Sequence, residues 1–350
     1  MVRKRELFKD RRSSNPAGLR SPDLTGVRVS VVIPAFNAGT RLDRTLRAAL
    51  AQTAPAHEII VIDDGSTDDT GAVCARFAPA VRCHRVPNGG QQRARNLGVD
   101  LATGDWIALL DQDDLWHSDY LAEVAAFLAA HDGAADLMLC DAESVQEAGQ
   151  DNEVLESSHL TERAPAGYWT GMGGDPAARW SRLPAFDVAR YPAFHPAQPS
   201  LTCVSIAFWR RIGGFDPRMR GNLAENLEFE MRALRTARVG VLWRPLVTVV
   251  NHDSNLTKDR LGVAMDLVDC LAFVRDHHDL TQAIREAVER EIQARLPAAI
   301  AAAFSVRDFA RVRRFGASQL GPADLRIRAK RAIAALPAPA ARLAAALVSH

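Results

Sequence analysis

The sequence predicts an α/β fold in which helices cover a mainly parallel sheet. Short runs rich in β-branched residues alternate with helix-length amphipathic segments, which is the pattern of consecutive β-α-β units. The runs over residues 58–63 and 106–110 have wholly apolar centres, as expected for strands that are buried on both faces.

The remaining elements are predicted from the same two patterns, β-branched runs for strands and amphipathic segments for helices. Strands are expected over residues 29–34, 58–63, 81–85, 106–110, 137–140, 201–206, 239–243 and 246–250. Helices are expected between the first five, with Thr40 and Ser118 as N-caps, and again over residues 225–236. Residues 142–200 show neither period and predict long ordered loops over a site. Residues 1–27 predict a disordered basic arm.

Composition excludes several classes of protein. Acidic and basic residues nearly balance, with a net charge of +1 at pH 7, so no global field indicates a nucleic-acid partner. The five cysteines are scattered without a CxxC pair, which predicts neither a zinc site nor a disulfide framework and fits a reducing compartment. The N-terminus lacks the apolar region of a secretory signal, and no apolar run is long enough to span a bilayer. We therefore expect a cytoplasmic protein.

Three carboxylates, Asp111, Asp113 and Asp114, directly follow the apolar run at 106–110. Open α/β sheets bind ligands at the carboxyl ends of their strands. Two acids one residue apart can direct their oxygens at one point, and Mg²⁺ commonly binds one or two carboxylates together with substrate phosphates. An acidic turn that only solvates the strand end would show the same spacing.

Five motifs in a fixed order resemble those of a family 2 glycosyltransferase of the GT-A fold. They are residues 31–37 (VVIPAFN), 61–68 (VIDDGSTD), 94–98 (ARNLG), 110–114 (LDQDD) and 213–216 (GGFD). The resemblance implies a GT-A type α/β/α sandwich over residues 28–258, with a nucleotide-sugar half at 28–141 and an acceptor half at 142–258. A helical C-terminal extension is expected over residues 259–350.

The resemblance also implies an activity. It is the transfer of a sugar, with inversion, from a nucleotide diphosphosugar to a hydroxyl of a saccharide or lipid-linked acceptor in cell-surface polysaccharide synthesis. A UDP-sugar is the leading donor and Mn²⁺ or Mg²⁺ the cofactor. By resemblance, the nucleotide contacts come from Pro34, Ala35, Phe36, Asn37, Asp64, Arg95, Asp111 and Gln112. Asp113 would bind the metal, Asp111 would orient the ribose or share the metal, and Asp114 would do either. His252 would touch the metal or the diphosphate. A loop histidine bonded to backbone is the alternative for His252.

The chain departs from the family pattern at the catalytic base. The family usually carries Glu-Asp after the GGFD motif, with the aspartate as base, but Asn226 stands there and an amide accepts no proton at neutral pH. Glu225 is the first candidate and Glu228 the second, although both could be ordinary helix acids. A non-catalytic sugar-nucleotide-binding protein is therefore an alternative. A nucleotidyltransferase is a weaker one, because its Gly-rich basic loop after the first strand is absent.

Basic and apolar residues alternate near the C-terminus. They are Arg326, Arg328, Lys330, Arg331 and Arg342 among Leu325, Ile327, Ile333, Leu343 and Leu347. A basic amphipathic helix can lie on an anionic membrane, and the resemblance adds that lipid-linked acceptors are common in the family. The sequence thus favours peripheral contact with the inner face of a membrane about as much as a helix packed on the protein.

Overall fold

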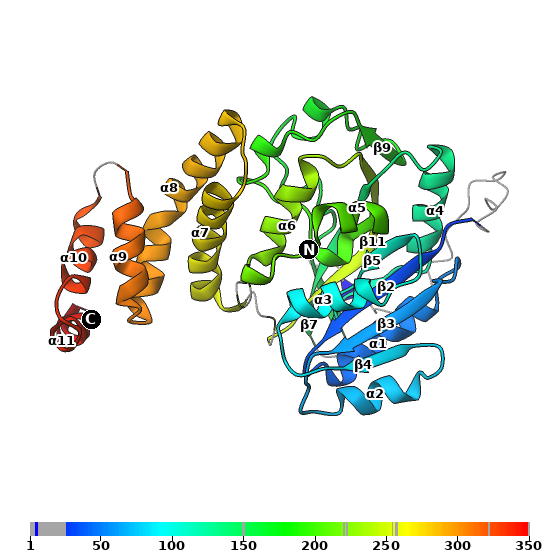
Figure 1. The fold of residues 1–350 in the computed structure, drawn as a ribbon, viewed down its shortest axis with the longest axis horizontal. Helices are drawn as coiled ribbons and strands as arrows, with labels where there is room; N and C mark the ends of the chain where they lie inside the picture. The colour runs from blue at the N-terminus through cyan, green and yellow to red at the C-terminus, as the bar shows by residue number, and fades with distance from the viewer. Residues whose placement is uncertain are drawn as a thin grey trace. The chain divides into compact units, whose positions relative to one another are not determined.

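A computed structural model of the protein describes residues 4–5, 26–148, 151–219, 221, 223–253, 255, 258–320 and 323–348 (Figure 1). They belong to two compact units. The first, the sheet unit, comprises Met1–Asp187, Phe194–Arg220 and Phe229–His252. The second, the helical unit, comprises Val188–Ala193, Gly221–Glu228 and Asp253–His350.

Most of the expected basic arm, residues 1–27, lies outside the described residues. Within it, Lys4–Arg5 form a short strand, β1. This strand pairs antiparallel with Asn152 and Glu153 of β8 (Asp151–Glu156), so the expectation of disorder does not hold at these two positions.

The sheet unit is built on one mixed sheet in the order β1-β8-β7-β10-β5-β2-β3-β4. Its bounds are β2 (Val29–Ala35), β3 (Glu58–Asp63), β4 (Arg82–Arg85), β5 (Trp106–Leu109), β7 (Leu137–Ala148) and β10 (Thr202–Ser205). Strands β5, β2, β3 and β4 are mutually parallel, whereas β10 runs antiparallel to both of its neighbours. The expected α/β fold with a central sheet of mostly parallel strands is confirmed.

A long strand, β11 (Val239–Asn251), replaces the two strands expected between residues 239 and 250. It pairs parallel with β7 and antiparallel with β6 (Leu115–Trp116) and β9 (Trp180–Leu183). Its register shifts on either side of Pro245, because proline donates no hydrogen bond to a ladder and is accommodated at an irregularity. The strand therefore bends without ending.

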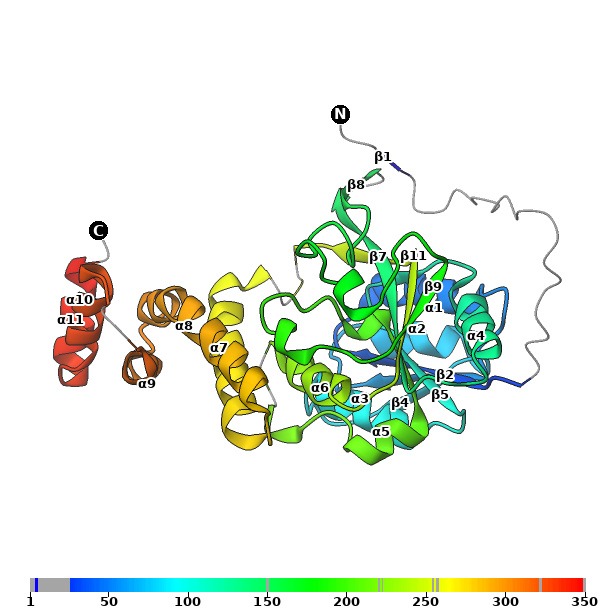
Figure 2. The ribbon, with the colours of Figure 1, turned by 90° about the horizontal axis from the view of Figure 1, so that it is seen from above.

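Helices cover both faces of the sheet (Figure 2). On one face lie α1 (Gly39–Leu50), α2 (Thr70–Arg76) and α4 (Tyr120–Ala130), whose apolar residues join Val31, Ile33 and Val61 in one core cluster. On the other face lie α3 (Gln91–Asp100) and α5 (Ile206–Ile212). Gly98 permits the close approach of α3, because a Cβ there would come within 2.3 Å of Val32 Cγ1.

The segment expected to be irregular, residues 142–200, is more regular than its composition indicates. β7 continues to Ala148, and β8, β9 and three 3₁₀ turns follow. Aromatic packing orders the loops between them: Trp169 lies edge-on to Trp243 with ring centroids 5.1 Å apart, and Tyr168 to Phe194 at 4.9 Å. The expected N-caps also differ, since Ala38 precedes α1 and Asp119 precedes α4.

The helical unit contains the expected C-terminal helices. Their bounds are α7 (Arg260–His277), α8 (Gln282–Ser305), α9 (Phe309–Ser318), α10 (Leu325–Ala334) and α11 (Ala338–Val348). Side chains of Asp259, Thr281, Asp308 and Asp324 cap the first four at their N-termini. Pro297, an expected interruption, lies inside the continuous α8. Among the described residues, no helix has the length and apolar character needed to cross a bilayer.

Candidate active site

Most of the residues expected to contact the nucleotide follow three parallel strands of the sheet unit, β2, β3 and β5. Ala35 of β2 lies opposite Asp63 of β3. The amide of Leu110, just after β5, donates to the carbonyl of Val32 at 3.1 Å. The segments that leave these strands therefore start at one edge of the sheet, which is the edge where open α/β sheets bind ligands.

The end of β2 forms the first wall of the site. Pro34 and Ala35 are buried within β2, which ends at Ala35, one residue after the expected end at Pro34. Phe36 follows with 45 % of its surface exposed, and its amide donates to Gln112 Oε1 at 2.7 Å. Asn37 has φ +49°, and its side-chain oxygen accepts from the Thr67 amide at 2.8 Å. The exposed ring of Phe36 offers an apolar face for a nucleobase.

The Asp64 carboxylate organises the turn before α3. Its two oxygens accept from the Gly89 and Gly90 amides, each at 2.8 Å, and the residue is only 4 % exposed. Gly90 has φ +90°, which favours glycine at this turn. Each carboxylate oxygen keeps a second acceptor site, so the expected contact with a nucleobase imide stays a prediction.

Arg95 is buried beside the acidic segment. Its Nη2 donates to Asp111 Oδ1 at 2.7 Å, and its Cζ lies 5.2 Å from the centre of the Phe215 ring. The Arg95 side chain is 2 % exposed, while that of Asp111 is 28 % exposed. Arg93, two residues earlier, is exposed, as expected for a residue on the helix surface. The arginine thus holds Asp111 through a charge-assisted hydrogen bond. Its guanidinium also contacts the ring of Phe215, which belongs to the GGFD motif.

Asp113 and His252 meet across the sheet unit, with Asp113 Oδ2 and His252 Nε2 2.8 Å apart. The side chains are 19 % and 6 % exposed. Burial raises the pKa of Asp113 and the charge of Asp111 adds to this rise, whereas the hydrogen bond and charge of His252 oppose it. The structure therefore pairs Asp113 with His252, two of the three residues that the resemblance assigned to the metal.

Asp114 belongs to the core, not to the surface of the site. Its Oδ2 accepts from Ser200 Oγ at 2.6 Å and its Oδ1 from the Val250 amide at 3.1 Å. Burial holds the pKa of Asp114 well above its usual range, with the charges of Asp113 and Asp111 adding to the shift. Asp114 therefore ties β11 to the acidic segment.

Sequence reasoning missed Ser200. Its hydroxyl donates to Asp114 and also accepts from the Asp111 amide at 2.9 Å, so one side chain holds both ends of the acidic motif. Nothing near Ser200 in the sequence signals this role, because both partners lie more than 80 residues away.

A divalent cation fits this donor set when substrate phosphates complete it. No group of three or more His, Cys, Asp or Glu side chains in the described part of the chain is arranged to hold a metal alone. Mg²⁺ usually takes one or two protein carboxylates and phosphate or water oxygens. The negative charge of Asp111 repels the ionised form of Asp113 and helps to raise its pKa. A bound cation would relieve this repulsion.

The two candidate bases occupy the first turn of α6 (Glu225–Leu234). Glu225 is 2 % exposed. Glu228 is fully buried, and its Oε1 lies 3.1 Å from His278 Nε2 within the helical unit. The pairing of Glu228 with a buried histidine suits a structural role at least as well as catalysis.

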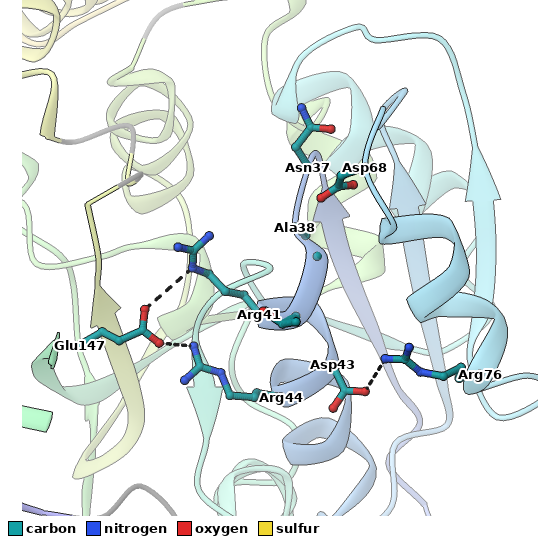
Figure 3. Close-up of a pocket in the computed structure, with 10 residues that line it drawn as sticks. Asn37, Ala38, Arg41, Asp43, Arg44, Asp68, Arg76 and Glu147 are labelled. Atoms are coloured by element: carbon teal, nitrogen blue, oxygen red, sulfur yellow. Dashed lines mark hydrogen bonds and ion pairs between the residues drawn. The ribbon is translucent and has the colours of Figure 1, made fainter. Parts of the chain in front are cut away.

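A pocket of about 700 Å³ opens beside Asn37 at the start of α1 (Figure 3). Arg44 and Arg41 both point toward Glu147, with nearest separations of 2.6 Å and 4.0 Å. Asp43 pairs with Arg76 on the other side at 2.9 Å. Ion pairs between these arginines and carboxylates therefore line the pocket.

Comparison with known proteins agrees with this geometry. Residues 30–169 match the sequence family described as glycosyl transferase family 2. A PGL/p-HBAD biosynthesis glycosyltransferase of Mycobacterium bovis is 39 % identical over 117 residues, which cover 32 % of this chain and 45 % of that protein. Glycosyltransferase GlyG of Streptococcus pneumoniae is 40 % identical over 91 residues, covering 25 % and 30 %. The chain thus matches less than half of the length of these curated relatives.

Solved structures extend the likeness in fold. S. aureus TarS 1–349 in complex with UDP gives a TM-score of 0.55 at 17 % sequence identity, covering 91 % of this chain and 90 % of that one. The complex of the same protein with UDP-GlcNAc gives 0.57 at 16 % identity. The fold is therefore of the α/β class with a central sheet of mostly parallel strands, and it matches neighbours of the GT-A type. Within it, residues 30–169 form a glycosyltransferase family 2 domain.

Proposed function

We propose that this protein is an inverting glycosyltransferase that moves a sugar from a nucleotide diphosphosugar to a hydroxyl of a saccharide or lipid-linked acceptor, in cell-surface polysaccharide synthesis. The observation that carries the proposal is the cluster of Arg95, Asp111, Asp113 and His252 at the strand edge of a family 2 domain. TarS was solved in complex with UDP and UDP-GlcNAc, which supports a uridine nucleotide as the carrier of the sugar.

The residues divide into two groups by their chemistry. The exposed Phe36 ring, Asn37 and Asp64 surround the place for the nucleoside, and Arg95 holds Asp111 in position beside it. Asp113, Asp111 and His252 would hold Mg²⁺ or Mn²⁺. When bound, the ion would stabilise the negative charge that grows on the departing diphosphate by several kcal/mol.

The acceptor hydroxyl needs a general base to accept its proton as it attacks the anomeric carbon. We assign this role to Glu225, the carboxylate next to the position where the family carries its base, and Glu228, one turn further along α6, is the second choice. A protein that binds the sugar nucleotide without transfer is the rival reading, since Asn226 stands where the family carries its base.

Calorimetry followed by a transfer assay separates these possibilities. The protein is titrated with UDP-sugars with and without Mn²⁺. It is then incubated with donor while UDP is measured, and separately with UTP and a sugar phosphate while pyrophosphate is measured. Metal-dependent binding with release of UDP supports a glycosyltransferase. Binding without UDP release supports the non-catalytic reading, and formation of pyrophosphate from a sugar phosphate and UTP supports a nucleotidyltransferase.

We further propose that the C-terminal helices contact an anionic membrane surface. Leu325, Leu343 and Leu347 are 79 %, 69 % and 77 % exposed, although leucine is usually buried. Basic residues of α10, including Arg326 and Arg328, lie close to Leu325 in the sequence. Apolar insertion together with electrostatic attraction is the combination by which such helices bind anionic lipid.

A further inference from the structure

The segment that leads into α6 is held by the C-terminal helices. Gly221–Glu228, which include the candidate base Glu225 and the first turn of α6, belong to the helical unit together with Asp253–His350. The surroundings of the candidate base therefore include helices that follow it in the sequence, and their contacts with this segment are direct.

Two side chains of α7 contact the backbone of this segment. Asp266 Oδ2 accepts from the Leu223 amide at 2.9 Å, and the Cys270 thiol donates to the Ala224 carbonyl at 3.2 Å. The same carbonyl accepts from the Leu227 amide at 3.1 Å and so takes part in the first turn of α6. Because Asp266 and Cys270 are four residues apart, they lie on one face of α7. This face therefore holds the two residues that immediately precede α6.

Asp266 is itself held through both of its carboxylate oxygens. Its Oδ1 accepts from Arg311 Nη2 of α9 at 2.9 Å, while its Oδ2 accepts from Leu223. The residue is only 5 % exposed, so water has little access to the carboxylate. A buried carboxylate requires such partners, and hydrogen bonds that involve a charged group are stronger than neutral ones. Asp266 therefore links α9 to the start of α6.

Asp269, on the same helix, shares one of these partners. Its Oδ2 lies 3.1 Å from Arg311 Nε, and its Oδ1 lies 2.5 Å from Nη2 of Arg314. Among the residues that the structure describes, Asp269 makes no hydrogen bond to the 221–228 segment. Loss of either aspartate thus removes an ion pair with Arg311, but only loss of Asp266 releases the start of α6.

We propose that Asp266 is a positioning residue for Glu225, the base in the proposed function on which this inference rests. A general base contributes only when it is within hydrogen-bond reach of the hydroxyl that it deprotonates. A displacement of about 1 Å can reduce a rate by about 10²-fold. Glu225 follows Leu223 by two residues, so release of the Leu223 amide loosens the turn that carries the base. In this role the C-terminal helices act on sugar transfer through the placement of Glu225.

The test compares Asp266→Ala with Asp269→Ala in the full chain. UDP-GlcNAc, which was bound in a similar structure, is the donor probe, and release of UDP gives kcat. Asp266→Ala should lower kcat by about 100-fold while the affinity for UDP with Mn²⁺ stays within about 2-fold. Amide hydrogen exchange over residues 221–228, measured without any ligand, should become faster. Asp269→Ala should keep kcat within about 3-fold and leave this exchange unchanged.

Asp266→Asn extends the comparison at constant side-chain volume. An amide has only one accepting oxygen, so it can accept from Leu223 or from Arg311 but not from both through separate oxygens. We expect an intermediate loss of kcat, about 10-fold, with the same split between rate and affinity. If Asp266→Ala does not fold, Asp266→Asn with Asp269→Asn as its control provides the same test.

Two results would overturn the positioning role. One is unchanged kcat in the Asp266 variants. The other is an equal loss of kcat in the Asp266 and Asp269 variants, because this would indicate general destabilisation of the helical unit through Arg311. Failure of the proposed function differs from both: the unaltered chain would then release no UDP, and the positioning role would fall with it.

Discussion

Asp113 Oδ2 lies 2.8 Å from Nε2 of His252, although 139 positions separate the two residues in the sequence. The contact joins the segment after β5 to the end of β11, and so links the nucleotide half of the sheet unit to its later half. A carboxylate and an imidazole at this distance form a hydrogen bond, and the same two groups are suited to bind one cation. The first prediction distinguishes these roles.

We expect Asp113→Ala to abolish metal-dependent binding of the donor, because the carboxylate is the principal oxygen ligand proposed for the cation. Calorimetric titration of UDP with and without Mn²⁺ measures this directly. Asp253→Ala is the matched control, since that carboxylate neighbours His252 but is fully exposed. Equal affinity of UDP for the Asp113 variant and the unaltered protein, both with Mn²⁺, would contradict the proposed site.

Arg95→Lys should weaken donor binding by about 10-fold, because lysine cannot reproduce a planar guanidinium that bonds Asp111 and faces the Phe215 ring. Arg93→Lys makes the same change two residues away on the exposed side of α3 and should leave the affinity unchanged. A direct comparison of the two dissociation constants checks this. If both variants bind equally well, Arg95 has no part in positioning the nucleotide site.

Glu225→Gln should leave donor affinity within about 2-fold and reduce sugar transfer by about 10²–10⁴-fold, the usual contribution of a general base. Steady-state release of UDP in the presence of acceptor is the measurement. Glu286→Gln, on the exposed side of α8, controls for the loss of one surface charge. Full activity of the Glu225 variant would move the role to Glu228 or to another group.

Glu58 should make stability depend on pH in the acid range. Burial works against its ionisation, but hydrogen bonds from Thr103, Ser30 and Arg82 outweigh it and lower the pKa of Glu58 to about 2. A depressed pKa contributes stability above the unfolded value of about 4.5, and this stability is lost as the pH falls toward about 2.

We therefore expect Glu58→Gln to reduce the free energy of unfolding by roughly 1–2 kcal/mol at pH 7, after allowance for partial solvent screening. The difference from the unaltered protein should shrink between pH 4.5 and pH 2. Denaturant titrations across this range provide the test, with Asp105→Asn, from an exposed pair with Arg28, as the control that changes stability much less. A difference that grows on acidification would show that the carboxylate is not ionised in the folded state.

Leu343→Ser combined with Leu347→Ser should weaken sedimentation of the full chain with vesicles that contain anionic lipid. Both side chains are largely exposed, so their replacement removes apolar area available to the bilayer and does not disturb the packing of α11. Leu155→Ser, at a leucine of β8 that is 54 % exposed, is the matched control. Equal sedimentation of the double variant and the unaltered chain would rule out contact through these leucines.

Much of the sheet unit could be predicted because its signals are local. A strand that is covered on both faces must be apolar along its whole length, so β2, β3 and β5 are visible as runs in the sequence. The continuity of β11 was not predicted, since two strands were expected where one bent strand continues past Pro245. Ordered loops were expected over residues 142–200, but the strands β8 and β9 were not, because this segment depends on contacts between distant residues, such as Trp169 with Trp243.

The candidate site divides in the same way. The acidic motif and its position after a buried strand are readable from residues 106–114. The sequence does not show which of these carboxylates faces a ligand, because this depends on the contact between Asp114 and Ser200, which lie 86 residues apart. The buried partnership of Glu228 with His278 likewise has no local signal.

By itself the sequence determined the alternation of strands and helices and the place of the carboxylates at a strand end, since burial on both faces imposes an apolar run on neighbouring residues. Only the tertiary structure decided that Asp114 enters the core while Asp113 stays beside His252. The physical reason is that hydrogen-bond partners and burial come from whichever segments fold against a residue, and these segments are remote in the chain.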